Sequence, residues 1–198
     1  MPMEQIVAFV LFAVVAAVTP GPSNIMLTAA GANVGVLRGL PCLFGVAAGM
    51  GLMMFVVPLG LGSLVLGYPV VLTALHWGGA VVLLWLSWKI ATSRGAVDAA
   101  SAGDQVGFLG AAIFQWVNPK ALTLVLGVVT AFTTVGGSPW VELATICLVF
   151  AVAVNLSSAI WCLFGMAIRS FLRSPRALRI TALIMAAVLA ASVVMLFV

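Results

Sequence analysis

Apolar residues form six long runs along the chain, separated by short stretches that hold the turn-forming and charged residues. The runs lie near residues 5–32, 40–66, 70–91, 108–133, 141–167 and 177–198. Each can cross a bilayer, because a hydrocarbon core of about 30 Å needs roughly 20 helical residues. None alternates between apolar and polar positions, as the strands of a membrane barrel do. The pattern predicts an all-α, polytopic membrane protein with six transmembrane helices.

The composition supports a membrane location for most of the chain. Of the 198 residues, 65% are apolar and only 6% are charged, and the mean hydropathy is +1.33. A soluble domain carries about 25% charged residues, so these few charges could not cover a water-facing surface. We expect one transmembrane domain over residues 1–198, in which a linker near 92–107 joins the first half (1–91) to the second (108–198).

The first apolar stretch, residues 6–18, has the length of a signal-peptide core. It lacks a positive flank before it, and the apolar run resumes directly after a short interruption. We therefore expect this stretch to be the start of the first transmembrane helix and not a cleaved leader.

Apart from Lys120, lysine and arginine are confined to alternate loops. The loops after the first, third and fifth runs hold Arg38, Lys89, Arg94, Arg169, Arg173, Arg176 and Arg179, and the other two loops hold none. Because positively charged loops remain cytoplasmic, both termini are predicted to be periplasmic. The net charge of +4 is then spread over membrane flanks beside lipid headgroups, which argues against a nucleic-acid partner.

Groups able to perform catalysis are scarce. The four acidic residues lie outside the centres of the runs: Glu4, Asp98, Asp104 and Glu142, the last opening the fifth run at the outer surface. His76 is the only histidine, and the three cysteines lack the spacing of metal ligands. A membrane enzyme needs acids, bases or metal ligands inside its bundle. We therefore predict no enzyme activity, no metal and no cofactor, and no energy coupling through a membrane carboxylate.

One lysine stands at the predicted centre of the fourth run, in the sequence N-P-K at Asn118, Pro119 and Lys120. A charge at that depth costs about 2.5 kcal/mol or more, so the ammonium should face a cavity or a partner. The alternative is that the run is shifted and Lys120 reaches the membrane surface through its flexible stem.

The first run is interrupted in the same way, by T-P-G-P-S-N at residues 19–24. Proline removes a helical hydrogen bond and favours a restart, so Thr19, Pro20, Gly21 and Pro22 predict a break. The first and fourth helices are equivalent members of two three-helix halves, which face opposite ways because three is odd. Paired broken helices in inverted repeats point to a transporter site, although each proline could also simply kink a packing helix.

The chemistry of such a site suits a small zwitterion. Each restarted half-helix presents free N–H groups and a positive dipole end, which attract a carboxylate. Each preceding half-helix ends in carbonyl groups that suit an ammonium group. Lys120 adds a full positive charge. The other classes that remain open are a small channel and a non-transporting assembly partner.

These residues also carry a family resemblance. T-P-G-P-S-N at 19–24, G-A-N-x-G at 31–35 and F-Q-W-V-N-P-K-A at 114–121 resemble the LysE/RhtB amino-acid exporters, most closely the cysteine and O-acetylserine branch. The resemblance implies an exporter of small neutral amino acids in the bacterial inner membrane, such as cysteine, O-acetylserine, threonine or homoserine. It assigns site roles to Thr19, Pro20, Gly21, Pro22, Asn24, Asn118, Pro119 and Lys120. Val82 stands where many members have a tyrosine, which predicts a changed substrate preference.

Two further features are weaker indications. Asn155, near mid-depth in the fifth run with Ser157 and Ser158, is a site candidate, although buried amides also simply bond between helices. The G-x-x-x-G repeats at Gly31/Gly35 and Gly45/Gly49 predict close helix contact. That contact lies within one chain or, alternatively, in a homodimer.

Overall fold

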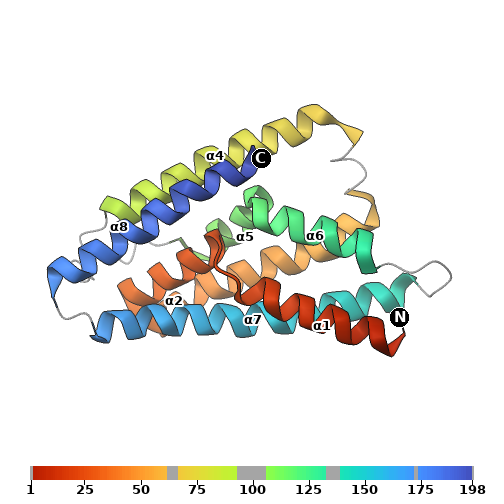
Figure 1. Ribbon diagram of the computed structural model, residues 1–198, viewed down its shortest axis with the longest axis horizontal. Helices are drawn as coiled ribbons and strands as arrows, with labels where there is room; N and C mark the ends of the chain where they lie inside the picture. The colour runs from red at the N-terminus through yellow and green to blue at the C-terminus, as the bar shows by residue number, and fades with distance from the viewer. Residues whose placement is uncertain (1, 62–66, 93–105, 133–138, 172–173, 198) are drawn as a thin grey trace.

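The computed structural model describes residues 2–61, 67–92, 106–132, 139–171 and 174–197. All regular structure in these residues is helical (Figure 1). The main helices are α1 (Met3–Val18), α2 (Pro22–Val56), α4 (Pro69–Thr92), α5 (Phe108–Val117), α6 (Pro119–Phe132), α7 (Pro139–Phe171) and α8 (Pro175–Ala191). A short π-helix, η1 (Val57–Leu61), follows α2, and a 3-10 helix, η4 (Ser192–Leu196), follows α8. The all-α prediction is confirmed for this part of the chain, while most of the linker predicted near 92–107 lies outside it.

Proline marks the start of α2, α4, α6, α7 and α8. Its missing N–H would have no intrahelical partner at the first helical position, and its ring already holds a helical φ. Both predicted interruptions are present for this reason. α1 ends at Val18 and the chain restarts at Pro22, while α5 ends at Val117 and restarts at Pro119 with a bend of 66°.

The chain also reverses its direction inside α2, at Gly35. Its φ of 78° and ψ of 176° are not helical, and a positive φ of this kind favours glycine. A Cβ placed on Gly39 would lie 3.8 Å from the Cβ of Ala30, whereas nine residues of straight helix span about 13.5 Å. The chain therefore folds back at Gly35, and α2 consists of a first arm (22–34) and a second arm (36–56).

The number of membrane spans differs from the sequence prediction if only uninterrupted helices are counted as spans. Within the described residues, four helices are long and apolar enough to cross a membrane, or five if the bent pair α5–α6 is one span. α1 is too short to cross by itself, with 16 residues. The stretch from Pro22 to Gly60 counts as one of these four helices. The chain nevertheless reverses within this stretch, at Gly35. The protein is thus a multi-pass membrane protein, and the count of six is not confirmed.

The helices lie in layers along the long axis of the molecule (Figure 1). α4 and α8 run side by side along one edge, α1, α2 and α7 form the opposite edge, and α5 and α6 lie between them. Large apolar side chains remain exposed on α4, α7 and α8, as expected of surfaces that contact lipid. The two broken helices meet in the interior between the layers.

Glycines set the closest helix contacts. A Cβ on Gly31 would lie 1.9 Å from the carbonyl oxygen of Cys162, and one on Gly165 would lie 2.0 Å from that of Thr28. These two positions hold the first arm of α2 against α7. Gly45 and Gly49 bring the second arm equally close to α5. The prediction of close contacts at the G-x-x-x-G repeats therefore holds within the chain, except at Gly35, which makes the reversal and has open space around it.

Candidate functional site at two helix breaks

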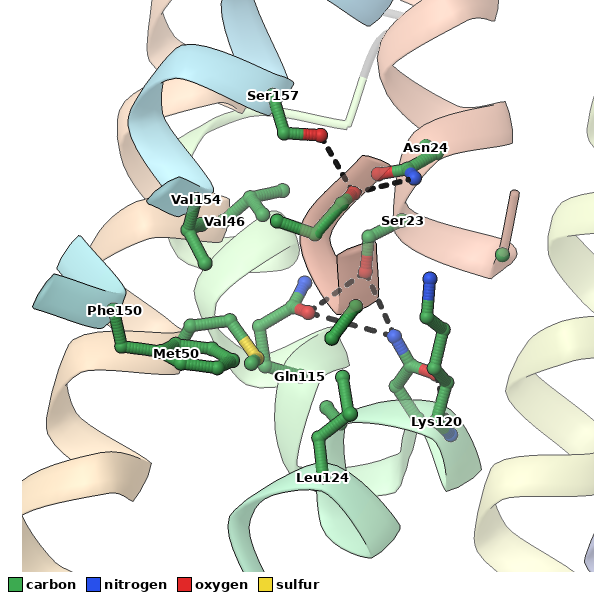
Figure 2. Close-up of a pocket in the computed structure, with 15 residues that line it drawn as sticks. Ser23, Asn24, Val46, Met50, Gln115, Lys120, Leu124, Phe150, Val154 and Ser157 are labelled. Atoms are coloured by element: carbon green, nitrogen blue, oxygen red, sulfur yellow. Dashed lines mark hydrogen bonds between the residues drawn. The ribbon is translucent and has the colours of Figure 1, made fainter. Parts of the chain in front are cut away.

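The two helix breaks face each other, the first with Thr19 and Pro20 exposed and the second with Asn118 and Pro119 buried. The Nζ of Lys120, in the first turn of α6, donates a hydrogen bond to the backbone carbonyl of Thr19, the residue that ends α1. Figure 2 shows the Lys120 side chain reaching toward the same space as Ser23 and Gln115. A cation is disfavoured in the first turn of a helix and favoured at the end of another. The carbonyl end of α1 therefore compensates the position of Lys120 near the start of its own helix.

Side chains donate to two backbone carbonyls at the end of α1. Asn24 Nδ2 donates to the carbonyl oxygens of Ala17 at 3.1 Å and Thr19 at 2.8 Å. Ser157 Oγ on α7 also donates to Ala17, at 2.6 Å. The sequence predicted free carbonyls at this place, and for Ala17 and Thr19 that prediction is wrong. The last carbonyls of a helix have no intrahelical partner, and here Asn24, just after the break, and Ser157, on a distant helix, supply donors.

The start of α2 is open by comparison. Gly21, which precedes it in extended conformation, makes no side-chain cap, and Pro22 has no N–H to offer. The first N–H groups of the restarted helix therefore have the character of an anion site. A Cβ on Gly21 would lie 2.6 Å from Cδ of Lys120 and 3.3 Å from its Nζ, so a larger residue here would push the flexible lysine side chain aside. The lysine stem thus passes directly over this helix start.

The second break is held by Asn118, which is 2% exposed. Its Oδ1 accepts from the N–H of Lys120 at 3.1 Å, the geometry of a helix N-cap. Its Nδ2 donates to Ser23 Oγ at 2.7 Å and lies 3.5 Å from Gln115 Oε1. Ser23 Oγ in turn donates to Gln115 Oε1 at 2.7 Å. A continuous polar network therefore joins the two breaks.

A cavity of about 40 Å³ lies between the breaks, α7 and the second arm of α2. Its polar lining comprises Gly21, Ser23, Asn24, Gln115, Asn118, Lys120 and Ser157. Its apolar side includes Val46, Met50, Leu124, Phe150 and Val154 (Figure 2). A volume of this size has room for a few water molecules. Most of the polar lining lies at the two breaks, with Ser157 added by α7, while the apolar lining comes from α1, α6, α7 and the second arm of α2.

The structure brings together five of the residues that the sequence singled out. Gly21, Asn24, Asn118 and Lys120 line the cavity, and Thr19 contributes its carbonyl. The three prolines of the motifs, Pro20, Pro22 and Pro119, shape the breaks but do not line the cavity.

Asn155 lies apart from this group. Its Nδ2 donates to the carbonyl of Ala151 on its own helix at 2.8 Å, and it does not line the cavity. Ser157, two residues later on α7, occupies that place instead. Val82 is partly buried against the core and is also absent from the lining.

Two polar residues of the network were missed by the sequence analysis. Ser23 directly follows the restart at Pro22, and Gln115 is three residues before Asn118. Residues three apart share a helix face, so Gln115 was a candidate once Asn118 was chosen. Gln115 is 0% exposed and anchors its own amide by donating to the carbonyl of Ala111 at 2.9 Å.

Titratable groups elsewhere do not assemble a second chemical site. Glu142 lies in the first turn of α7, at the start of the fifth apolar run, and its side chain is 4% exposed. His76 packs edge-on against Phe197. In the described part of the chain, no group of three His, Cys, Asp or Glu residues could hold a metal ion. Asp98 and Asp104 lie outside the described residues.

The residues of this site also fall within a match to a known protein family. The model of the LysE type translocator family matches residues 14–198, which includes both breaks and all of the cavity lining. No curated protein and no solved structure matches the chain significantly. Translocators of this family are transporters and not enzymes, and they move amino acids or related compounds out of the cell. The chain therefore belongs to the LysE type translocator family and is a multi-pass efflux transporter.

Proposed function

We propose that the protein exports small neutral amino acids or their derivatives, such as cysteine, O-acetylserine, threonine or homoserine, across the bacterial inner membrane. The observation that carries the proposal is the contact between Lys120 and the carbonyl of Thr19 beside a cavity. It places a full positive charge, an open helix start and a helix carbonyl end within one small space. These are the groups that a carboxylate and an ammonium group require.

The lining of the cavity supports a substrate with an uncharged side chain. The carboxylate would bind Lys120 and the N–H groups at the start of α2, beside Gly21. The ammonium group would bind the carbonyl end of α1, beside Asn24. Among the described residues, none that lines the cavity is acidic, and Val46, Met50, Phe150 and Val154 form an apolar wall, so a second charge on the substrate would lack a partner. The substrate-binding residues we propose are Thr19, Gly21, Asn24, Asn118 and Lys120, with Pro20, Pro22 and Pro119 shaping the breaks.

We also propose six spans arranged as two inverted repeats. The first repeat (1–91) contains α1 with the first arm of α2, the second arm, and α4. The second repeat (108–198) contains α5 with α6, then α7, then α8. In each repeat the first span is broken, and the third spans lie side by side (Figure 1). There Ser87 Oγ donates to the carbonyl of Ala186 at 2.7 Å.

The proposed orientation places the reversal at Gly35 and the end of α7 on the cytoplasmic side, and both termini in the periplasm. One hydrogen bond supports a common side for the positive residues. Arg169 Nη1, in the last turn of α7, donates to the carbonyl of Asn33 at 3.0 Å, two residues before the reversal that precedes Arg38. Arg94 and Arg173, which the same rule places in the cytoplasm, lie outside the described residues.

Uptake of radiolabelled amino acids into everted membrane vesicles tests the proposal, because export from the cell becomes uptake in this geometry. We expect saturable uptake of at least one of cysteine, O-acetylserine, threonine and homoserine, above that of vesicles lacking the protein. Flux that does not saturate would indicate a channel. Absence of flux for all four solutes would contradict export of this substrate class and would favour an assembly partner.

A further inference from the structure

Two carbonyl oxygens at the end of α1, those of Ala17 and Thr19, each accept two donors. The oxygen of Ala17 accepts from Asn24 Nδ2 at 3.1 Å and from Ser157 Oγ at 2.6 Å. The oxygen of Thr19 accepts from Asn24 Nδ2 at 2.8 Å and from Lys120 Nζ. Because a carbonyl oxygen has two lone pairs, neither oxygen can accept another donor. An ammonium group that binds at either oxygen must therefore displace one of the three donors already present.

Only one of those donors is placed to leave. The side chains of Asn24 and Ser157 are 8% and 2% exposed and carry no charge, so moving them would leave buried polar atoms without partners. Lys120 is partly buried, lines the cavity and ends a flexible four-carbon stem. Its ammonium is also chemically equivalent to the group that would replace it.

We propose that Lys120 is a tethered competitor for the ammonium subsite. In the structure its Nζ occupies the position at the Thr19 carbonyl that the ammonium group of the solute takes when it binds. On binding, Nζ moves to the carboxylate of the solute, beside the open start of α2 at Gly21. The inference deepens the proposed function and rests on it, since it assigns the two ends of a zwitterion to two subsites.

This exchange selects for solutes that carry both charged groups. A zwitterion displaces Lys120 from the carbonyl and supplies the carboxylate that receives it, so the number of charges without a partner does not change. A simple amine displaces Lys120 but offers it no new partner, leaving two cations in one cavity. A carboxylate without an amino group leaves Lys120 divided between two acceptors. The lysine thus excludes monoamines although the site contains acceptors for an ammonium group.

The test uses a matched set of probes based on L-threonine. 1-Amino-2-propanol lacks its carboxylate, and 3-hydroxybutyrate lacks its amino group. Binding of each radiolabelled probe is measured by equilibrium dialysis on the purified full-length protein in lipid nanodiscs, with choline as the only buffer cation. The variants are Lys120→Met, Lys120→Arg, which keeps the charge, and Lys89→Met, which removes a lysine from α4.

We expect Lys120→Met to bind 1-amino-2-propanol at least about tenfold more tightly than the wild type, because a tethered group competes at an effective concentration of order millimolar. Lys120→Arg and Lys89→Met should behave as the wild type toward this amine. Equal amine affinity in the wild type and Lys120→Met would overturn the proposal. Absence of amine binding to both would overturn it as well, since the vacated carbonyl would then not be a cation subsite.

The result must be distinguishable from misfolding of the variant and from failure of the proposed transport function. Lys120→Ala provides a second neutral variant, with the same expectation, if Lys120→Met cannot be purified in folded form. The amine measurement does not depend on transport, so the two proposals can fail separately. If the wild type moves no amino acid but Lys120→Met gains amine binding, the proposed substrate class is wrong and the competition stands.

Discussion

Replacing Asn118 with alanine tests whether the polar network holds the second helix break. The change removes the N-cap bond to the N–H of Lys120 at 3.1 Å and the bond to Ser23 Oγ at 2.7 Å. Loss of a cap costs about 1 kcal/mol, and loss of a hydrogen bond between membrane helices costs about 0.6 kcal/mol. We therefore expect the free energy of unfolding to fall by roughly 1.5 kcal/mol.

Asn155→Ala is the matched control, because it removes the same side chain from another transmembrane helix. Asn155 is bonded at 2.8 Å only to the carbonyl four residues earlier in its own helix, where alanine has the higher helix propensity. Its replacement should change the free energy of unfolding by less than about 0.5 kcal/mol.

Both values are measured by reversible unfolding in mixed detergent micelles, where added SDS unfolds the protein and tryptophan fluorescence follows the transition. Vesicle transport is measured on the same variants, and only Asn118→Ala should lose most of its activity. The reasoning is refuted if Asn155→Ala destabilises the protein as much as Asn118→Ala, because the network at the break would then contribute nothing specific.

Three further predictions follow from the packing, the orientation and the acids. Gly31→Ala should lower the free energy of unfolding by about 1–3 kcal/mol, because its Cβ would lie 1.9 Å from the carbonyl oxygen of Cys162. Gly78→Ala should have little effect, because Gly78 has open space around it. Equal effects of the two substitutions would contradict the close packing of Gly31. In a cysteine-free background, Arg38→Cys should react with an impermeant maleimide only from the cytoplasm and Tyr68→Cys only from outside, and the reverse result would invert the proposed orientation. Glu142→Gln should leave any dependence of export on the proton gradient unchanged, because Glu142 does not line the cavity; loss of that dependence would show coupling through this carboxylate.

The two breaks could be predicted from sequence because their causes are local. Proline at the first position of a helix and glycine before it act within a few residues, so T-P-G-P and N-P-K predict breaks without knowledge of the fold. The cost of placing a charge at mid-membrane is likewise a property of Lys120 alone. These local rules account for the two breaks, which the structure confirms, and for the position of Lys120 between them.

What could not be predicted depends on packing between distant segments. The carbonyls at the end of α1 were expected to be free, but those of Ala17 and Thr19 accept from Asn24 and also from α7 and α6, more than 90 residues away in the sequence. Whether Asn155 or Ser157 faces the cavity depends on the rotation of α7, which is set by the contact of Gly31 with the Cys162 backbone. Gly35 was interpreted as a contact glycine, since the sequence does not distinguish that role from a reversal with positive φ.

Solute counterflow in proteoliposomes tests the central claim most directly, namely that a small zwitterion crosses the membrane through the site held by Lys120. Liposomes are loaded with an excess of one unlabelled amino acid, and entry of the labelled form is followed for the wild type, Lys120→Met and the control Lys89→Met. We predict transient accumulation with the wild type and with Lys89→Met, and none with Lys120→Met, although that variant remains folded. Full counterflow by folded Lys120→Met would contradict the account.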